Sequence, residues 1–493
     1  MFRHSQVLLL TALLLPASIR AQTPAFRLAP AGYLSARGAD VLVFSNWYSG
    51  LFSDSKLSGI ELIHHGVRTA TNGDVRLSRT PEQWDPIPEF VGRDVDSASG
   101  RIRARLRYPK YDFAYAIVAE PDPYGVQVSV ELERPLPAEL AGRAGFNLEF
   151  LPSAYFGKTW SADGRAGAFP RQAGGAMRPS AWGRLEAVPL DSARTFVLAP
   201  EDPERRVMVE THGWIALYDG RTKAQNGWFV LRGLLPAGKT GRVLEWHIWP
   251  NRIPGWTRPP VIAHSQAGYA PSQAKVAVLE LDPNYAAPPS ATLLRLSPYG
   301  ELTPVLRATA TPWGRWLRYE YRRFDFSGVR QPGTYLIEYG GVRTEPFRIG
   351  DDVYAGIWQS TLDTFMPVQM DHVLVREGYR VWHGAAHLDD ARQAPAPHEH
   401  FDLYAQGPGT DSPFKAGDHI PGLNVGGWFD AGDFDIRTQS QYAVIQDLAL
   451  AYTEFDLKYD QLTVDEKARS VEMHRPDGIP DAVQQVKHGV LQV

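Results

Sequence analysis

The chain has 493 residues, of which 44% are hydrophobic and 22% charged, with a formal net charge of −4 and no cysteine. This length exceeds what a single hydrophobic core organises, so we expect about two to four domains. The near balance of acids and bases gives no electrostatic reason for nucleic acid or an anionic membrane as a partner. The lack of cysteine excludes disulfides, thiolate metal sites and a cysteine nucleophile.

The first 21 residues have the pattern of an export signal. A charged start at residues 1–3 is followed by an apolar run at 7–15 and small residues at 17–21. This order predicts a signal peptide at residues 1–21 that is removed after Ala21. The apolar run is too short for a bilayer, and no later stretch could span one. We therefore expect a secreted or periplasmic bacterial protein without a membrane span.

Residues 22–255 are dominated by strand signals. Apolar and polar residues alternate at 101–108, 111–117 and 126–132, and strand patterns return at 228–231 and 243–249. A period of two between proline-containing turns predicts one large antiparallel β-sandwich. Its aromatic residues could fill a core or line a sugar-binding face, so the sequence leaves the role of this domain open.

A proline-rich linker at 253–260 leads into a second β segment at 260–350. Short strands are predicted at 275–281, 293–296, 316–321 and 334–339. That many strands in about 90 residues favours an immunoglobulin-like β-sandwich.

The pattern becomes helical from residue 351 onward. Apolar residues repeat at helical spacing in 357–366, 442–452 and 479–493, and each range predicts a helix. We expect the first of these helices to stop near Pro367. The intervening residues 371–429 are rich in His, Asp, Pro and Gly. Irregular segments of this length in compact domains are usually functional.

An acidic run at residues 426–435 reads G-G-W-F-D-A-G-D-F-D and places Asp430, Asp433 and Asp435 within six positions. Carboxylates this close repel one another unless they hold a cation, a proton or a water. The neighbouring aromatic rings suit a sugar, whose C–H face stacks on a ring while carboxylates bind hydroxyls. Two other interpretations stay open from these residues alone: a calcium loop, and an Asx turn that caps the next helix.

A second polar cluster reads W-H-G-A-A-H-L-D-D-A at 382–391. His383 and His387 are four residues apart, which on a helix would place both imidazoles on one face. With Asp389 they form a candidate zinc or calcium site. In the alternative interpretation, these polar residues bind the loop around a substrate cleft. The candidate substrate-binding residues are Tyr379, Trp382, His383 and Trp428, and core packing is the alternative for the aromatic ones.

Several segments resemble one enzyme family. H-S-Q-A-G-Y at 264–269, Q-P-G-T-Y at 331–335 and P-F-R-I-G-D-D-V-Y at 346–354 resemble the N-terminal immunoglobulin-like domain of bacterial cellulases. The acidic run resembles the Asp-Ala-Gly-Asp motif of glycoside hydrolase family 9. P-D-G-I-P-D at 476–481 is similar to the next signature of that family. The resemblance covers roughly residues 260–493.

This resemblance implies an (α/α)6 barrel that hydrolyses β-1,4-linked glucans or related sugars with inversion and without a required cofactor. Asp433 corresponds to the general base, Asp430 to the residue that helps hold the attacking water, and we expect Asp435 to cap a helix. The partner would be an oligo- or polysaccharide. Some members carry a Cys/His zinc site near His387, but here Ala386 precedes that histidine, so the site is missing or rebuilt.

The predicted fold is thus multidomain: a large antiparallel β-sandwich at 22–255, an immunoglobulin-like β-sandwich at 260–350, and the first part of an (α/α)6 barrel at 351–493. The family's general acid is a glutamate far along its catalytic domain, and no residue here matches it. We therefore expect a C-terminally truncated piece of a longer enzyme. The alternatives are a non-catalytic carbohydrate-binding multidomain protein and an exo-acting, glucosaminidase-type member of the family.

Overall fold

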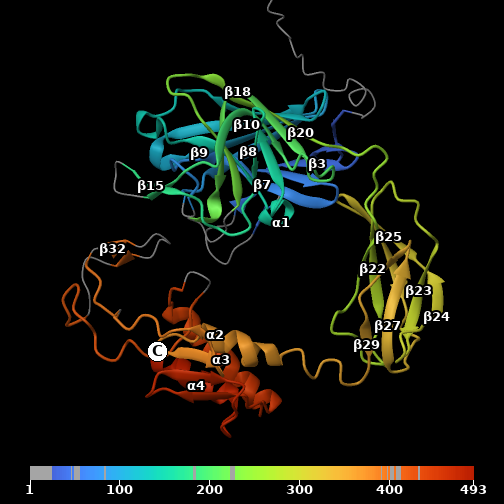
Figure 1. The fold of residues 1–493 in the computed structure, drawn as a ribbon, viewed down its shortest axis with the longest axis vertical. Helices are drawn as coiled ribbons and strands as arrows, with labels where there is room; N and C mark the ends of the chain where they lie inside the picture. Colours follow the sequence, from blue (N-terminus) through green and yellow to red (C-terminus); the bar gives the residue numbers. More distant parts are fainter. Residues whose placement is uncertain are drawn as a thin grey trace, which may run out of the picture.

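The computed structural model describes residues 25–45, 47–48, 56–82, 85–180, 185–222, 228–389, 391–396, 398–399, 405–406, 412–430 and 434–493. The chain forms three bodies: a large β domain at the top of Figure 1, an immunoglobulin-like domain at the right, and a C-terminal body below. The signal peptide predicted at residues 1–21 lies outside the described residues.

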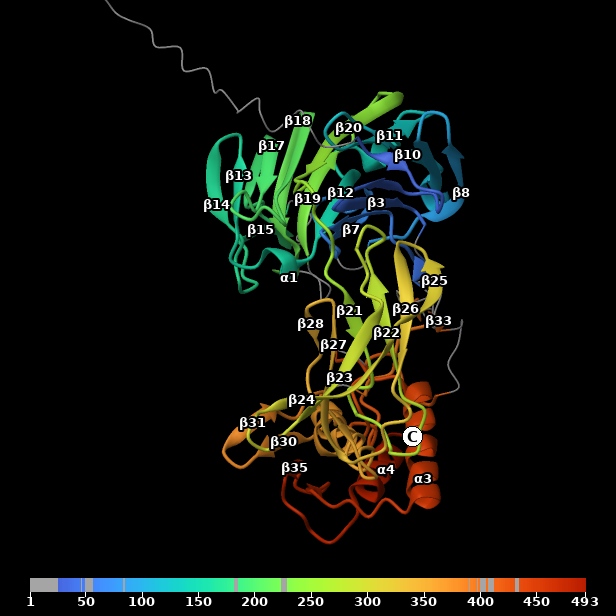
Figure 2. The ribbon, with the colours of Figure 1, turned by 90° about the vertical axis from the view of Figure 1, so that its right-hand side faces the viewer.

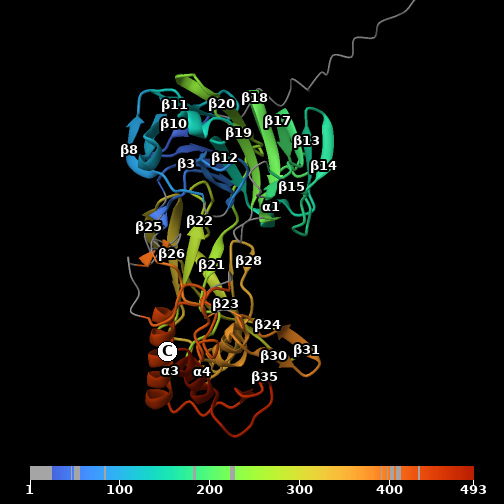
Figure 3. The same ribbon diagram turned by 90° about the vertical axis from the view of Figure 1, so that its left-hand side faces the viewer.

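The large β domain is built on one curled, antiparallel sheet, which has 16 strands within the described residues. Its order is β1-β2-β3-β6-β7-β12-β19-β18-β20-β11-β10-β9-β8, with β13, β14 and β17 attached at the side of β18 (Figure 3). The strands are β1 (Arg27–Leu28), β2 (Leu34–Ala36), β3 (Ala39–Val43), β6 (Ile60–His64), β7 (Val67–Arg76), β8 (Glu89–Asp96), β9 (Arg101–Tyr108), β10 (Phe113–Pro121), β11 (Val126–Leu132), β12 (Gly145–Phe150), β13 (Thr159–Ala162), β14 (Arg165–Ala168), β17 (Asp191–Leu198), β18 (Val207–Asp219), β19 (Phe229–Leu234) and β20 (Gly241–Pro250).

Shorter elements complete this domain. They are the strand pairs β4 (Trp47–Tyr48) with β5 (Lys56–Leu57) and β15 (Met177–Pro179) with β16 (Leu185–Ala187), the single-turn helix α1 (Pro152–Tyr155), and the 3₁₀ turns η2 (Pro109–Tyr111), η3 (Ala138–Leu140) and η4 (Gly220–Thr222). The strands predicted in this region are confirmed, but they form one large curled sheet and not the two separate sheets of the predicted β-sandwich.

The alternation in β9 shows how the sequence divides the two faces of the sheet. Ile102, Ala104, Leu106 and Tyr108 are buried in the core, and the arginines between them point away from it. In an extended strand successive side chains point to opposite faces, so the arginines must reach the solvent side.

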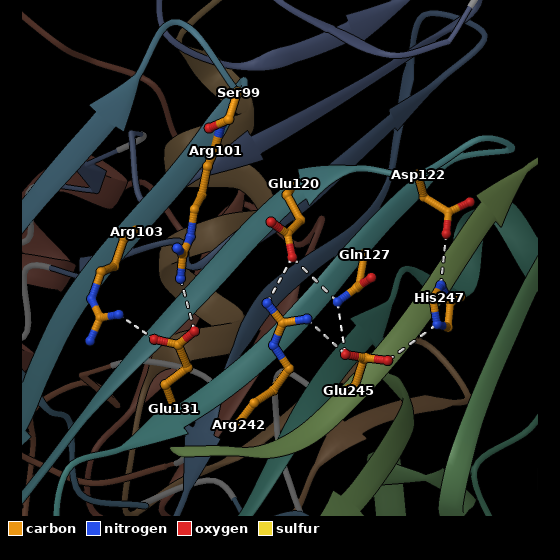
Figure 4. A network of polar contacts seen from close by, with 10 residues as sticks. All are labelled: Ser99, Arg101, Arg103, Glu120, Asp122, Gln127, Glu131, Arg242, Glu245 and His247. Carbon is orange, nitrogen blue, oxygen red and sulfur yellow. Dashed lines mark hydrogen bonds and ion pairs between the residues drawn. The ribbon is translucent and has the colours of Figure 1, made fainter.

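Cross-strand polar contacts cover that solvent side, and Figure 4 shows them joining β9, β10, β11 and β20. Arg242 donates to Glu120 at 2.9 Å and to Glu245 at 3.0 Å, and the His247 Nδ1 lies 2.7 Å from the Asp122 Oδ2. Cross-strand pairs at a sheet surface contribute little individually, on the order of 0.2–1 kcal/mol. Their effect is to keep a broad sheet face solvated and in register.

The immunoglobulin-like domain consists of two packed antiparallel sheets, in the orders β21-β22-β26-β25 and β24-β23-β27-β28, with β29 paired to β27. Its strands are β21 (Val261–Ala263), β22 (Val276–Leu281), β23 (Ser290–Leu296), β24 (Leu302–Thr309), β25 (Thr311–Trp316), β26 (Tyr319–Asp325), β27 (Gly333–Tyr339), β28 (Val342–Arg343) and β29 (Phe347–Ile349). The predicted sandwich is confirmed. The single strand predicted at 316–321 is wrong, because a hairpin turn with Leu317 at φ 50° divides it into β25 and β26.

The C-terminal body combines a small mixed sheet with two long helices. The sheet order is β31-β30-β35-β34, in which β30 and β35 are parallel. The elements are the π-helical turn η5 (Thr361–Phe365), α2 (Met366–Gln369), β30 (Leu374–Glu377), β31 (Arg380–His383), β32 (His398–Glu399), β33 (Ala405–Gln406), α3 (Thr438–Phe455), β34 (Leu462–Asp465), β35 (Ser470–Met473) and α4 (Asp481–Gln492).

The first helix ends at Gln369, close to the stop that the sequence predicts near Pro367. Pro367 itself falls in the first turn of α2, where a missing N–H is tolerated. One detail of the predicted helices is wrong. In α4 the predicted apolar face is on the wrong side. Val483, Val490 and Val493 are exposed, while Gln484, Gln485 and His488 are buried. Among the described residues, no helix is both long and apolar enough to cross a membrane.

Candidate active site

The first half of the acidic run is held between the α2–β30 loop and α4. Trp428 forms a bridge with Met370, and the Phe429 N–H donates to the Gln369 carbonyl at 2.8 Å. Gly426 is at φ +67°, and a Cβ there would lie 2.2 Å from the His488 carbonyl oxygen. The glycine pair in the motif is therefore needed for the close approach of residues 426–430 to α4.

Trp428 belongs to the core of the C-terminal body. Its side chain is only 4% exposed, and its indole N–H donates to the Gln485 Oε1 at 2.7 Å. Gly489 of α4 packs directly on the ring, since a Cβ there would lie 2.3 Å from the indole. The structure thus favours the core-packing alternative for Trp428, because no face of the ring is left for a sugar.

Gln441 of α3 fixes the backbone of Trp428. Its Oε1 accepts from the Trp428 N–H at 2.9 Å, and its Nε2 donates to the Trp428 carbonyl at 2.7 Å. Gln441 is 2% exposed, and its side-chain amide pairs with the N–H and the carbonyl of Trp428 as the backbone of a neighbouring strand would. Sequence reasoning missed Gln441. The sequence offers one indication of its role: Gln441 is a polar residue in the first turn of the helix that directly follows the acidic run.

Asp430 lies two residues after Trp428, with its carboxylate anchored on both oxygens. Oδ1 accepts from the Ser440 hydroxyl at 2.8 Å, and Oδ2 lies 3.3 Å from the Arg437 Nε. Because one hydrogen bond and one ion pair hold it, the carboxylate is fixed in direction and can orient a water or a hydroxyl. Asp433, the predicted general base, lies outside the described residues.

Asp435 is not the helix cap that the sequence predicted. The N-cap of α3 is Arg437, and no side chain caps it. Asp435 is used otherwise: its Oδ2 accepts from the Arg437 Nε at 3.0 Å and its carbonyl accepts from the Asp430 N–H at 2.7 Å. Arg437 therefore lies between two carboxylates of the acidic run and offsets their repulsion.

A buried polar cluster backs the run from the other side. Asp371 is fully buried, and its carboxylate accepts from the His372 N–H at 2.6 Å and pairs with the His387 Nδ1. The His372 Nδ1 lies 2.7 Å from the Gly426 carbonyl, and burial lowers the pKa of this imidazole. A neutral His372 that donates to Gly426 fixes the glycine turn from behind. The Asp-His pair at 371–372 was the available sequence signal for this cluster.

The other predicted substrate-binding residues lie on the β30–β31 hairpin. Tyr379 is at its turn and is 97% exposed, and Trp382 is 49% exposed. His383 contacts the acidic run, since its ring centroid is 5.4 Å from that of Phe429. The structure brings His383 together with the run and leaves the two aromatic rings exposed on the hairpin.

The metal site proposed for His383, His387 and Asp389 is not formed. Residues 383–387 are the end of β31 and irregular chain, so the helical spacing on which the prediction depended does not exist. His387 pairs with Asp371, and the His383 Nδ1 lies 2.9 Å from the Gly384 carbonyl. Across the described parts of the chain, no group of three His, Cys, Asp or Glu residues could hold a metal ion.

Comparison with known families identifies the middle body. The model of the cellulase N-terminal ig-like domain matches residues 257–344. This confirms the resemblance to cellulases that carry an N-terminal immunoglobulin-like domain over the segment that the match covers. The search of curated proteins found no match.

Solved structures of family 9 glycoside hydrolases are similar to part of the chain. A metagenome-derived family 9 endoglucanase is 22% identical, with a TM-score of 0.35, over 47% of this chain and 39% of its own. A family 9 protein from Bacteroides ovatus is 21% identical, with a TM-score of 0.34, over 46% and 37%. AaCel9A, solved with cellobiose-like isofagomine, is 21% identical, with a TM-score of 0.30, over 47% and 36%. The match thus spans less than two fifths of each of these structures.

Proposed function

We propose that this chain is part of an exported glycoside hydrolase that cleaves β-1,4-linked glucan with inversion. The observation that carries the proposal is the order of two features: a domain of the kind found N-terminal in cellulases, followed by an acidic run whose Asp430 is fixed by Ser440 and Arg437. The exported location follows from the predicted signal peptide.

In the proposed reaction Asp433 removes a proton from the attacking water, and Asp430 holds that water in place. The water oxygen bonds to the anomeric carbon as the glycosidic C–O bond breaks, and an acid on the opposite face protonates the leaving oxygen. Inversion requires the base and the acid to be about 6.5–9.5 Å apart, with the water between them. The reaction needs no cofactor.

We propose further that residues 351–493 contribute the first helices of an (α/α)6 barrel. Exposed apolar side chains on α3 and α4, among them Tyr442, Phe455, Val483 and Val490, support this, since such a surface is usually covered. The acid would then be a glutamate supplied from outside these residues.

The test is hydrolysis of cellotetraose by the protein extended through its reading frame, beside the present chain alone. We expect the extended protein to release the α-anomer first, detected by proton NMR. Asp433→Asn should lower kcat by about 10²–10⁴ with little change in KM. Asp447→Asn, an exposed carboxylate on α3, is the matched control and should leave kcat unchanged. Release of the β-anomer, or full activity of Asp433→Asn, would contradict the proposal.

A further inference from the structure

A cavity of about 380 Å³ lies between the large β domain and the immunoglobulin-like domain. In Figure 2 the β25–β26 end of the immunoglobulin-like domain meets the underside of the large β domain at this place. Tyr33 and Asp40 come from the large domain, Trp256 from the linker, and Asp282, Arg315 and Arg318 from the immunoglobulin-like domain. Ligand sites occur preferentially at such domain interfaces.

Hydrogen bonds between the parts fix the walls of the cavity. Arg37 donates through Nε to the Trp256 carbonyl and through Nη2 to the Thr257 hydroxyl, each at 2.6 Å. The Arg258 N–H donates to the Asp282 Oδ2 at 3.1 Å. The linker is therefore hydrogen-bonded to both β domains, and these bonds hold the walls of the cavity in place.

Asp40 and Arg318 face each other across the cavity without a direct hydrogen bond. The Asp40 Oδ1 accepts from the Ser35 hydroxyl at 2.6 Å, while its Oδ2 lies 3.8 Å from the Arg318 Nε. That Nε is buried and has no hydrogen-bond partner in the described part of the chain, but 21% of each side chain is exposed. At this exposed part a hydroxyl group suits the pair, because it donates to the carboxylate and accepts from the guanidinium at the same time.

The mixed charge of the walls decides the ligand class. Asp40 and Asp282 balance Arg315 and Arg318 in these walls, so their net charge favours neither an anion nor a cation. Trp256 adds a partly exposed, flat apolar ring. We propose that this cavity is a second carbohydrate site, which binds one pyranose unit of a neutral sugar through Asp40, Arg318 and Trp256. The site is separate from the acidic run and does not depend on its function.

The test is titration of the present chain with cellobiose, in an Asp430→Asn/Asp433→Asn background that removes the acidic run as a competing site. We expect binding at a one-to-one ratio, weakened at least tenfold by Asp40→Asn and by Arg318→Gln. Asp352→Asn, a carboxylate of the immunoglobulin-like domain outside the cavity, is the matched control and should bind as the parent does. Equal affinity in all variants would overturn the proposal.

A second measurement does not depend on how the charge variants fold. With 5-fluorotryptophan incorporated, the Trp256 resonance is assigned by its loss in Trp256→Phe and should shift when cellobiose is added. Sodium glucuronate and glucosamine, at the same concentration, should each bind at least tenfold more weakly. If either charged sugar bound more tightly than cellobiose, the proposal that the site prefers a neutral sugar would be wrong. If the Trp256 resonance did not shift with cellobiose, the proposed second carbohydrate site would be wrong. That result would leave the proposed hydrolase function untouched, because the hydrolysis assay tests it separately.

Discussion

Gln441 shows how a residue outside a motif can position it. Its side-chain amide forms hydrogen bonds to both the N–H and the carbonyl of Trp428, and Asp430 lies two residues further along the chain. The carboxylate is then aimed by Ser440 and Arg437, which are also on or beside α3. The first turn of this helix therefore sets both the position and the direction of Asp430.

We predict that Gln441→Ala destabilises the C-terminal body by about 2–4 kcal/mol, because a buried N–H and a buried C=O lose their partners. Hydrogen exchange of peptides covering residues 426–455 measures this as faster exchange. Gln446→Ala, the same change at an exposed position of α3, is the control and should exchange like the parent. Equal protection in both variants would show that the two hydrogen bonds are not needed.

At the scale of elements, α4 packs through its polar side. Gln485 binds the Trp428 indole, and the His488 Nε2 lies 2.9 Å from the Gly427 carbonyl while its Nδ1 lies 2.9 Å from the Glu466 Oε1. The imidazole of His488 therefore lies between the glycine turn and Glu466, with one ring nitrogen toward each. The helix thus binds the glycine turn of the motif with hydrogen bonds and leaves its valines exposed.

Gly489→Ala separates helix propensity from packing. Alanine is favoured over glycine inside a helix by about 1 kcal/mol, so propensity alone predicts a more stable protein. The added Cβ would lie 2.3 Å from Trp428 and 2.7 Å from the Ile445 side chain, so we predict a net loss of about 1–3 kcal/mol. Urea denaturation followed by near-UV circular dichroism tests the sign. Lys487→Ala, exposed on the same helix, is the control and should change stability little.

At the scale of the whole molecule, the interface between the two β domains contains a titrating group. Burial raises the pKa of Asp40 to about 6, outweighing the Ser35 hydrogen bond and the Arg318 charge, and Asp282 acts in the same direction as burial. Because the folded protein holds this proton more tightly than the unfolded chain, the stabilisation is fully present below about pH 4. It is lost as the pH rises through about 6.

We predict that Asp40→Asn, which cannot titrate, becomes progressively more stable than the parent as the pH rises from 4 to 8. The difference reaches at most about 3 kcal/mol, the equivalent of a shift of about two pKa units. Hydrogen exchange of peptides covering β2 and β3, measured at each pH, gives the free energies. A difference that stays constant, or that grows toward acid pH, would contradict the raised pKa.

The sequence alone determined the order of the bodies, because strand and helix periodicity follow from which face of an element is buried. The alternation of arginine and apolar residues in β9 and the helical spacing of α3 both gave the correct element. The periodicity could not tell which side of α4 is buried, since its buried glutamines and histidine find partners that are distant in sequence. The same reasoning explains why Gln441, Asp371 and His372 were missed.

Only the tertiary structure decided what the polar residues of the C-terminal body do. A four-residue spacing of histidines predicts a shared face only on a helix, and the fold made that segment the end of a strand. Trp428 became core because α4 carries a glycine opposite it. The acidic run was evident in the sequence from its composition. The anchoring of Asp430 and the cavity at Asp40 depend on contacts between segments far apart in the chain, which no local pattern records.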